Sequence, residues 1–251
     1  MKTLIYTLVL GGLISGAMFS PISGNVKKTT PLISITDVLR AHTEARDYTA
    51  LSTWLAEGVK LTSLPGGLGS DLASFFERKL KVVSDGRSFK RYKADPLGLR
   101  EQVDLFDGRS ASHTVKENGR QVEETDIAES ELAPVEFSIR TFGLLPILKE
   151  LADPSTLVTY LETTPRKQDK FFVRGAIGDL TVYCDQQHTI CRVEIGDKVI
   201  EYADYRFVDG VRLPFFQRVY LNGRLVYEII FTKIELGPVL PAGYFKRDSA
   251  W

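Results

Sequence analysis

Cys184, His188 and Cys191 are the side chains in this chain best suited to chemistry, because they share one short stretch, YCDQQHTIC. A zinc site needs three or four ligands, and His42 and His113 lie far away in sequence without ligand neighbours. A redox pair normally has C-x-x-C spacing at a helix start, which is shorter than the spacing here. The sequence therefore predicts neither a metal site nor a redox motif in this stretch.

A disulfide is the remaining chemistry, and it depends on strand register. DLTVYCD and TICRVEI both have strand composition. A hairpin that turns at Gln187-His188 sets Cys184 opposite Cys191, close enough for a bridge. A turn one position earlier would set Cys184 opposite Thr189 and leave the thiols diagonal. We expect a Cys184–Cys191 disulfide, with two free thiols as the alternative.

The N-terminus predicts an oxidising destination for these thiols. Residues 1–24, MKTLIYTLVLGGLISGAMFSPISG, have one lysine, an apolar run from Leu4 to Phe19, and small residues after it. This order is typical of a secretory signal peptide, and the run is shorter than the ~20 residues of a membrane span. We expect a chain exported to the periplasm or cell envelope and soluble after cleavage, where disulfides form. An uncleaved N-terminal anchor is the alternative.

The composition of the chain excludes some partners. Lys+Arg and Asp+Glu both number 32, with no long run of one sign, so nothing favours nucleic acid as a partner. A hydrophobic content of 43% supplies enough apolar residues for a substantial core. The length of residues 25–251 fits one β-rich domain or at most two small ones, and we expect a single domain.

No constellation of catalytic residues is evident. The segment 66–71, GGLGSD, lacks the Lys-Ser/Thr pair of a phosphate loop. Ser112 and His113 are adjacent, so a strand would point them to opposite faces. His42 lies on the apolar stripe of the first predicted helix, which is typical of a hydrogen-bonded core residue. We therefore predict no catalytic residue, no cofactor and no enzymatic activity.

The predicted elements describe an antiparallel meander with few helices. Ser34 is a good N-cap for a first helix in the segment SITDVLRAHTEA, residues 34–45. The segment Val135–Ser155 has helical periodicity but contains Pro146, which predicts two short helices that meet near Gly143. Strand-like runs elsewhere are separated by dipeptides that favour hairpin turns: Asp85-Gly86, Asp107-Gly108, Asn118-Gly119, Asp209-Gly210 and Asn222-Gly223.

The last hairpin has large apolar residues on both predicted faces. A two-residue turn at Asn222-Gly223 would pair Phe215 with Ile230 on one face and Phe216 with Ile229 on the other. A sheet with one solvated face should instead have one polar face. Either helices or a second sheet cover both faces of this hairpin, or one of its faces lines an apolar cavity.

The final third of the chain resembles the LolA/LolB-like superfamily, the outer-membrane lipoprotein-sorting proteins and their exported relatives. The resemblance rests on Tyr205-Arg206-x-Val208-Asp209-Gly210-x-x-Leu213-Pro214, on Ile234-Glu235-Leu236, and on the closing Leu240-Pro241…Phe245. The upstream order of an opening helix, hairpins with LFDGRSASHTV and an apolar helical interval also fits. The resemblance spans about Ser34 to Phe245.

This resemblance implies an α+β fold, an incomplete antiparallel β-barrel whose curved sheet has helices covering its concave face. It also implies an apolar cavity that holds a lipid or the acyl chains of a lipoprotein-like ligand. Residues expected to line this cavity are Phe142, Leu145, Ile147 and Leu148 from the lid, Val135–Ser155, with Phe216, Tyr227 and Ile229 from the sheet. The alternatives are an envelope scaffold that binds a protein partner through its surface, with a fully packed interior, and a hydrolase with an unrecognised site.

Overall fold

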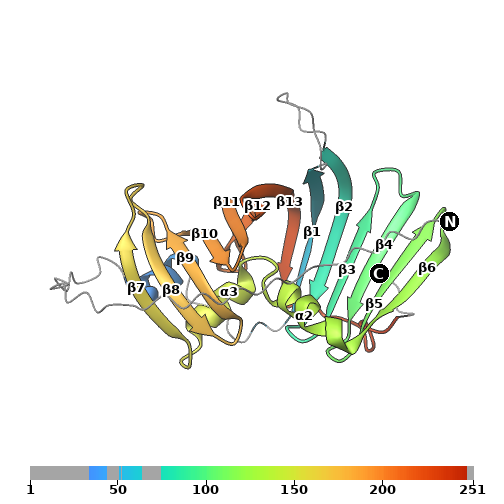
Figure 1. Cartoon of the computed structure of the whole chain (residues 1–251), viewed down its shortest axis with the longest axis horizontal. Coiled ribbons are helices and arrows are strands. Elements are labelled where there is room, and N and C mark those ends of the chain that lie inside the picture. The colour runs from blue at the N-terminus through green and yellow to red at the C-terminus, as the bar shows by residue number, and fades with distance from the viewer. Residues whose placement is uncertain (1–33, 44–50, 52, 64–74, 248–251) are drawn as a thin grey trace, which may run out of the picture. The chain divides into compact units, whose positions relative to one another are not determined.

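The computed structural model describes residues 34–43, 51, 53–63 and 75–247, and in them one antiparallel sheet of thirteen strands carries helices along one face (Figure 1). The predicted signal peptide, residues 1–24, and the segment 66–71 lie outside the described residues. The described residues all fall in one compact unit, residues 31–251.

The sheet is built from two meanders that meet in its middle. The first contains β1 (Trp54–Ser63), β2 (Phe75–Ser84), β3 (Phe89–Ala94), β4 (Arg100–Phe106), β5 (Ala111–Glu117) and β6 (Arg120–Ile127). The second contains β7 (Leu157–Thr163), β8 (Asp169–Gly175), β9 (Gly178–Cys184), β10 (Ile190–Ile195), β11 (Lys198–Val208), β12 (Val211–Leu221) and β13 (Arg224–Leu236). β13 pairs with β1, so β6 and β7 become the two edges of the sheet.

The predicted hairpin turns are confirmed. Asn118, Asp209 and Asn222 have φ values of 51, 49 and 50°, and the glycine after each also has a positive φ. Two consecutive left-handed residues match the right-handed twist of the flanking strands, which is why Asn-Gly and Asp-Gly occupy these turns. Gly86 and Gly108 likewise have positive φ values within their turns.

Within the described residues, four short helical segments accompany the sheet. In α1 (Ile35–His42), Ser34 and Asp37 form the capping box that starts the helix. The segment with Pro146 is split as predicted, into α2 (Leu132–Arg140) and α3 (Leu145–Ala152), with the short η2 (Glu129–Glu131) ahead of them. Pro146 is tolerated because it lies in the first turn of α3, where its missing donor is not needed.

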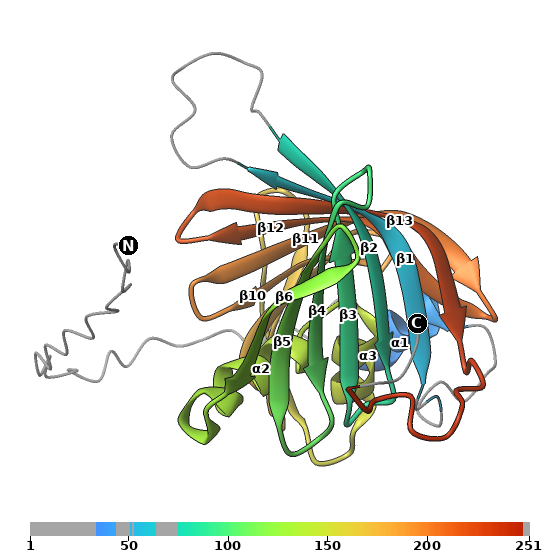
Figure 2. The same cartoon turned by 90° about the vertical axis from the view of Figure 1, so that its right-hand side faces the viewer.

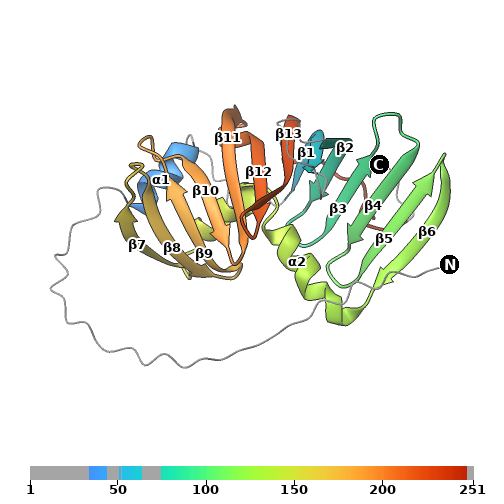
Figure 3. The ribbon, with the colours of Figure 1, turned by 45° about the horizontal axis from the view of Figure 1, so that its top comes forward.

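The sheet curves around the helices without closing. Figure 2 shows α1, α2 and α3 inside the arch formed by the strands, and Figure 3 shows the two meanders on either side of α2. Side chains alternate along each strand, so one set of apolar residues faces the helices and forms the core. The predicted α+β class, an incomplete antiparallel β-barrel with helices on its concave face, is confirmed.

The register of the last hairpin differs from the prediction. The turn at Asn222-Gly223 is present, but a bulge between Val219 and Tyr220 on one strand, opposite an extra residue in β13, shifts the pairing. Phe216 therefore pairs with Ile230 and not with Ile229. Because one extra residue exchanges the two faces of a strand, the predicted grouping of Phe216 with Ile229 on one face is wrong.

Candidate functional site

The end of the concave face that the helices cover is apolar and tightly packed. Phe142, in the joint between α2 and α3, stacks on Trp54 with ring centroids 5.9 Å apart. The rings of Phe89 and Phe231 meet the same side chain edge-on, with centroids 6.0 and 6.4 Å away. Aromatic groups from three strands thus enclose Phe142, which makes this residue part of the core.

The other predicted lid residues are also buried in the core. Leu145 is 5% exposed, and Ile147 and Leu148 are fully buried. The space between Leu145 and Phe231 of the sheet is only about 30 Å³, and a separate cleft of about 220 Å³ lies at the rim, between the start of α3 and Ile177. The side chains of Ile147 and Leu148 are therefore packed into the region beneath α3, where the sequence predicted an apolar cavity.

An open cleft lies farther along the same face, between α2 and the strands β3 to β5. Its volume is about 220 Å³. Val135 and Ile139 of α2 form one wall, and Phe89 and Phe106 of the sheet form the other. Arg91 and Asp104 also line the cleft, so it is apolar with one charged end.

The three predicted sheet residues are divided between the two faces. Ile229 is 1% exposed and faces the core, and Tyr227 is packed against that core from the same side. Phe216 lies on the outer face, where the Arg218 guanidinium is 5.0 Å from its ring centroid. The structure thus brings Tyr227 and Ile229 together with the lid residues and leaves Phe216 outside.

Charged residues occupy the concave face immediately beyond the aromatic group. Arg91 pairs in register with Asp104, and Asp104 pairs with His113. The Asp104 carboxylate lies 2.8 Å from Arg91, 3.0 Å from Lys93 and 2.6 Å from the Nδ1 of His113. One carboxylate is therefore shared by a guanidinium, an ammonium and a histidine ring.

Two further cations lie on the next row. Lys60 of β1 is opposite Arg78 of β2 in the ladder. The Arg78 guanidinium donates to the neutral Gln102 amide over 2.7 Å, and the Lys60 ammonium lies 4.0 Å from the centroid of the Tyr227 ring. Among the described residues, neither Lys60 nor Arg78 has a carboxylate partner. We refer to Lys60, Arg78, Arg91 and Lys93 as the cationic cluster.

The electrostatics of the cluster reflect its excess positive charge. Burial, together with Arg91 and Lys93, lowers the pKa of Lys60 to about 7. Lys198 of β11 lies on the same concave face. Burial lowers its pKa to about 8, and Arg91 contributes to this shift. Burial alone would raise the pKa of Asp104, but Arg91 and Lys93 hold it well below its usual value. The site therefore favours added negative charge.

Sequence reasoning missed the cationic cluster. The signal was present in FKRYKA, where Arg91 and Lys93 are two residues apart and so share one face of a strand. Which face that is depends on long-range pairing with β1 and β2, and the sequence alone did not supply it.

The predicted disulfide is wrong. Cys184 is opposite Ile190, and Cys191 is the extra residue of a bulge between Ile190 and Arg192. The hairpin turns through Asp185–Thr189, with His188 in the left-handed region at φ 63°. Cys184 therefore points into the core, whereas Cys191 lies on the other face, and both are free thiols.

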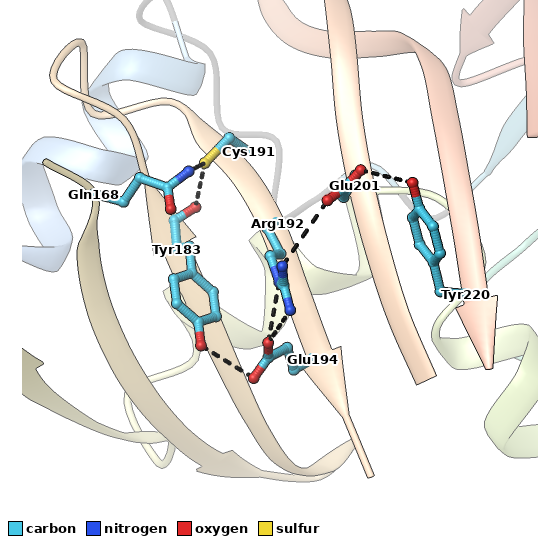
Figure 4. A network of polar contacts seen from close by, with 7 residues as sticks. All are labelled: Gln168, Tyr183, Cys191, Arg192, Glu194, Glu201 and Tyr220. Carbon is cyan, nitrogen blue, oxygen red and sulfur yellow. Dashed lines mark hydrogen bonds and ion pairs between the residues drawn. The ribbon is translucent and has the colours of Figure 1, made fainter. Parts of the chain in front are cut away.

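Cys191 belongs to a polar network on the outer face (Figure 4). Its thiol donates to the Tyr183 carbonyl over 3.4 Å and accepts from the Gln168 amide over 3.2 Å. The Tyr183 hydroxyl continues the network to Glu194, and Arg192 joins Glu194 to Glu201. Burial raises the pKa of the Cys191 thiol to about 11, so it stays protonated and unreactive at neutral pH.

Across the part of the chain that the structure describes, no three His, Cys, Asp or Glu side chains gather in a way that could hold a metal ion. Within the same residues, no helix combines the length and apolar character needed to cross a membrane.

Comparison of the sequence with protein-family models and with curated proteins finds no match. Comparison of the structure with solved structures does find relatives of the fold. A LolA superfamily protein from Nitrosomonas europaea matches with a TM-score of 0.53 and 14% identity, over 86% of this chain and 99% of that one.

A DUF1329 family protein from Desulfovibrio piger matches with a TM-score of 0.52 and 13% identity, over 85% of this chain and 95% of that one. Both matches include nearly the whole length of the solved chain. The fold of this protein is therefore LolA-like, as the resemblance predicted. At this level of identity the likeness concerns the fold and leaves the ligand open.

Proposed function

We propose that this protein is an exported, non-enzymatic binding protein of the periplasm or cell envelope that holds a lipid or acylated ligand against its concave face. The observation that carries the proposal is the cleft between α2 and β3–β5, with apolar walls and a charged end. Burial of each CH2 group of an acyl chain contributes about 0.8 kcal/mol to binding. The LolA-like fold supports the proposal, because the superfamily that the sequence resembles includes the outer-membrane lipoprotein-sorting proteins.

The size of the cleft requires α2 to act as a mobile cover in this proposal. At about 220 Å³ the cleft is smaller than the roughly 300–1,000 Å³ of common ligand pockets. Polar contacts at the C-terminal end of α2 include those from Arg140 to the Ala176 carbonyl over 3.4 Å and from Lys198 to Thr141 over 3.2 Å. Outward movement of α2 would break these contacts and widen the cleft.

A filling variant tests the position of the ligand. Val135→Trp places a bulky ring in the cleft without burying a charge, and Phe137→Trp alters the exposed side of the same helix as a control. We expect organic extraction and mass spectrometry to release lipid from the purified protein and from Phe137→Trp. Val135→Trp should release much less at unchanged thermal stability.

The second candidate function is an envelope scaffold that works through its surface. The observation in its favour is the close packing beneath α3, whose Ile147 and Leu148 side chains are fully buried. If the purified protein releases no lipid and takes up none from detergent or vesicles, the binding proposal is wrong and the scaffold is favoured.

A further inference from the structure

The charges on the concave face indicate which kind of ligand this site accepts. Strands β1, β2 and β3 place the four side chains of the cationic cluster on adjacent rows of one face. Asp104 is the carboxylate bonded to the cluster, and it is already shared by Arg91 and Lys93. Arg78 therefore contributes positive charge that no described carboxylate neutralises, and Lys60, whose pKa burial lowers to about 7, adds to this charge when it is protonated.

The other charged groups on this face do not remove the excess. Arg100 of β4 and Glu117 of β5 form an ion pair with each other over 3.6 Å. Glu123 is exposed on the edge strand β6, in the row of Val115. Lys198 of β11, on the same concave face, adds a further cation, and its ammonium donates to the Thr141 hydroxyl.

This arrangement is costly for the protein alone. A partly desolvated cation without a counter-charge is unfavourable, and clustering several cations adds mutual repulsion. Lys93 is only 14% exposed and Arg91 26%, so solvent screens them incompletely. A bound anion would relieve both costs through charge-assisted hydrogen bonds.

The cluster also continues the apolar surface. Along β3 the concave face carries Phe89, then Arg91, then Lys93, and along β1 it carries Trp54, Ala56, Gly58 and Lys60. A ligand with a hydrocarbon tail in the cleft at Phe89 would thus place its polar end beside Arg91 and the cluster. The concave face therefore changes from apolar to cationic along the direction of the strands β1 and β3.

We propose that the cationic cluster receives the anionic head group, a carboxylate or a phosphate, of an amphipathic ligand whose hydrocarbon tail lies in the cleft beneath α2. This inference rests on the proposed lipid-binding function and specifies the ligand class of that site. Lys60 and Arg78 supply the unneutralised charge, and Arg91 with Lys93 orients the head group beside Asp104.

Dodecyl compounds of equal chain length test the head group separately from the tail. Dodecanoate, dodecyl phosphate, dodecanol and dodecyltrimethylammonium are titrated calorimetrically, below their micelle concentrations, into purified protein freed of lipid. We expect the two anions to bind at least about tenfold more tightly than dodecanol, because a charge-assisted hydrogen bond is worth that factor or more. The cationic compound should bind least. Preference for the phosphate indicates a phospholipid head group, and preference for the carboxylate indicates a fatty acid.

Paired variants assign the effect to the cluster. Lys60→Gln/Arg78→Gln should lower the affinity for dodecanoate about tenfold or more and leave dodecanol unchanged. The control, Lys79→Gln/Lys81→Gln, removes two charges from the other face of β2 and should alter neither. A measurement on the unaltered protein needs no variant: raising the salt concentration should weaken dodecanoate binding and leave dodecanol binding unchanged.

The outcomes separate the two proposals. Equal affinity for dodecanoate, dodecanol and dodecyltrimethylammonium would show that the head group is not recognised, while lipid binding itself stands. Absence of binding by every compound overturns the proposed function, and the present inference with it. Loss of anion affinity in the control pair would move the anion site to the other face and overturn the assignment to the cluster.

Discussion

Acid should destabilise this protein through His42, a histidine buried where α1 meets the sheet. His42 is fully buried, and its two ring nitrogens have different partners. The Nδ1 donates to the Arg212 carbonyl over 2.9 Å, and the Nε2 accepts from the Ile190 backbone N–H over 3.0 Å. This arrangement requires the neutral ring, because a protonated Nε2 could no longer accept from Ile190.

The size of the effect follows from the pKa of His42. Burial lowers this pKa from 6.5 to about 4. Between these two values the unfolded chain binds a proton that the folded protein does not, so the free energy of unfolding decreases as the pH falls from about 6.5 to about 4. At about 1.4 kcal/mol per pH unit, the total loss is about 3 kcal/mol. This is a large part of the stability of an ordinary domain.

The assay compares urea unfolding of the protein and of His42→Leu between pH 7.5 and pH 3.5. At pH 7.5 the variant should be less stable, because the Ile190 N–H and the Arg212 carbonyl each lose a partner at about 1–3 kcal/mol. The difference in the free energy of unfolding should narrow by about 3 kcal/mol toward pH 3.5, because protonation of His42 destabilises only the unaltered protein. A difference that stays constant with pH, or a His42 ring that titrates near 6.5 by NMR, would refute the reasoning.

Two further predictions concern packing and the cysteines. Gly58→Ala should lower the free energy of unfolding by at least about 2 kcal/mol, because the new Cβ would lie 2.2 Å from the Ile230 carbonyl oxygen. Gly119 has open space around it, so Gly119→Ala should lower the free energy of unfolding by about 1 kcal/mol, through backbone strain alone. Chemical denaturation would check both, and similar losses in the two variants would contradict the close approach. When the protein is unfolded without reductant, two thiols per chain should react with a thiol reagent, whereas essentially none should react in the folded protein. If no thiol reacted after unfolding, the two cysteines would form a disulfide, contrary to the observed register.

Features decided by neighbouring residues were predictable from the sequence. The five hairpin turns follow from Asn-Gly and Asp-Gly dipeptides, which tolerate positive φ values. The start of α1 at Ser34 and the division of the second helical segment near Gly143 follow from capping chemistry and from Pro146. The burial of His42 followed from its place on an apolar helical stripe.

The errors in the disulfide and in the last hairpin both involve strand register. One extra residue at Cys191 and another in β13 beyond Asn222-Gly223 exchanged the faces that Cys191 and Phe216 occupy. No local signal marks these bulges, because the energy that selects them comes from packing across the sheet. The cationic cluster was missed for the same reason, since its facing depends on the pairing of β2 with β3.

The sequence by itself determined the list of turns, the alternation within each strand and the positions of the helices, because these depend on backbone preferences over a few residues. Only the tertiary structure decided that β13 pairs with β1 and that a bulge places Cys184 and Cys191 on opposite faces of the sheet. It also decided that Lys60 and Arg78 lie on the concave face. The physical reason is that a strand has two faces that alternate residue by residue. Long-range pairing alone chooses which face is turned toward the core.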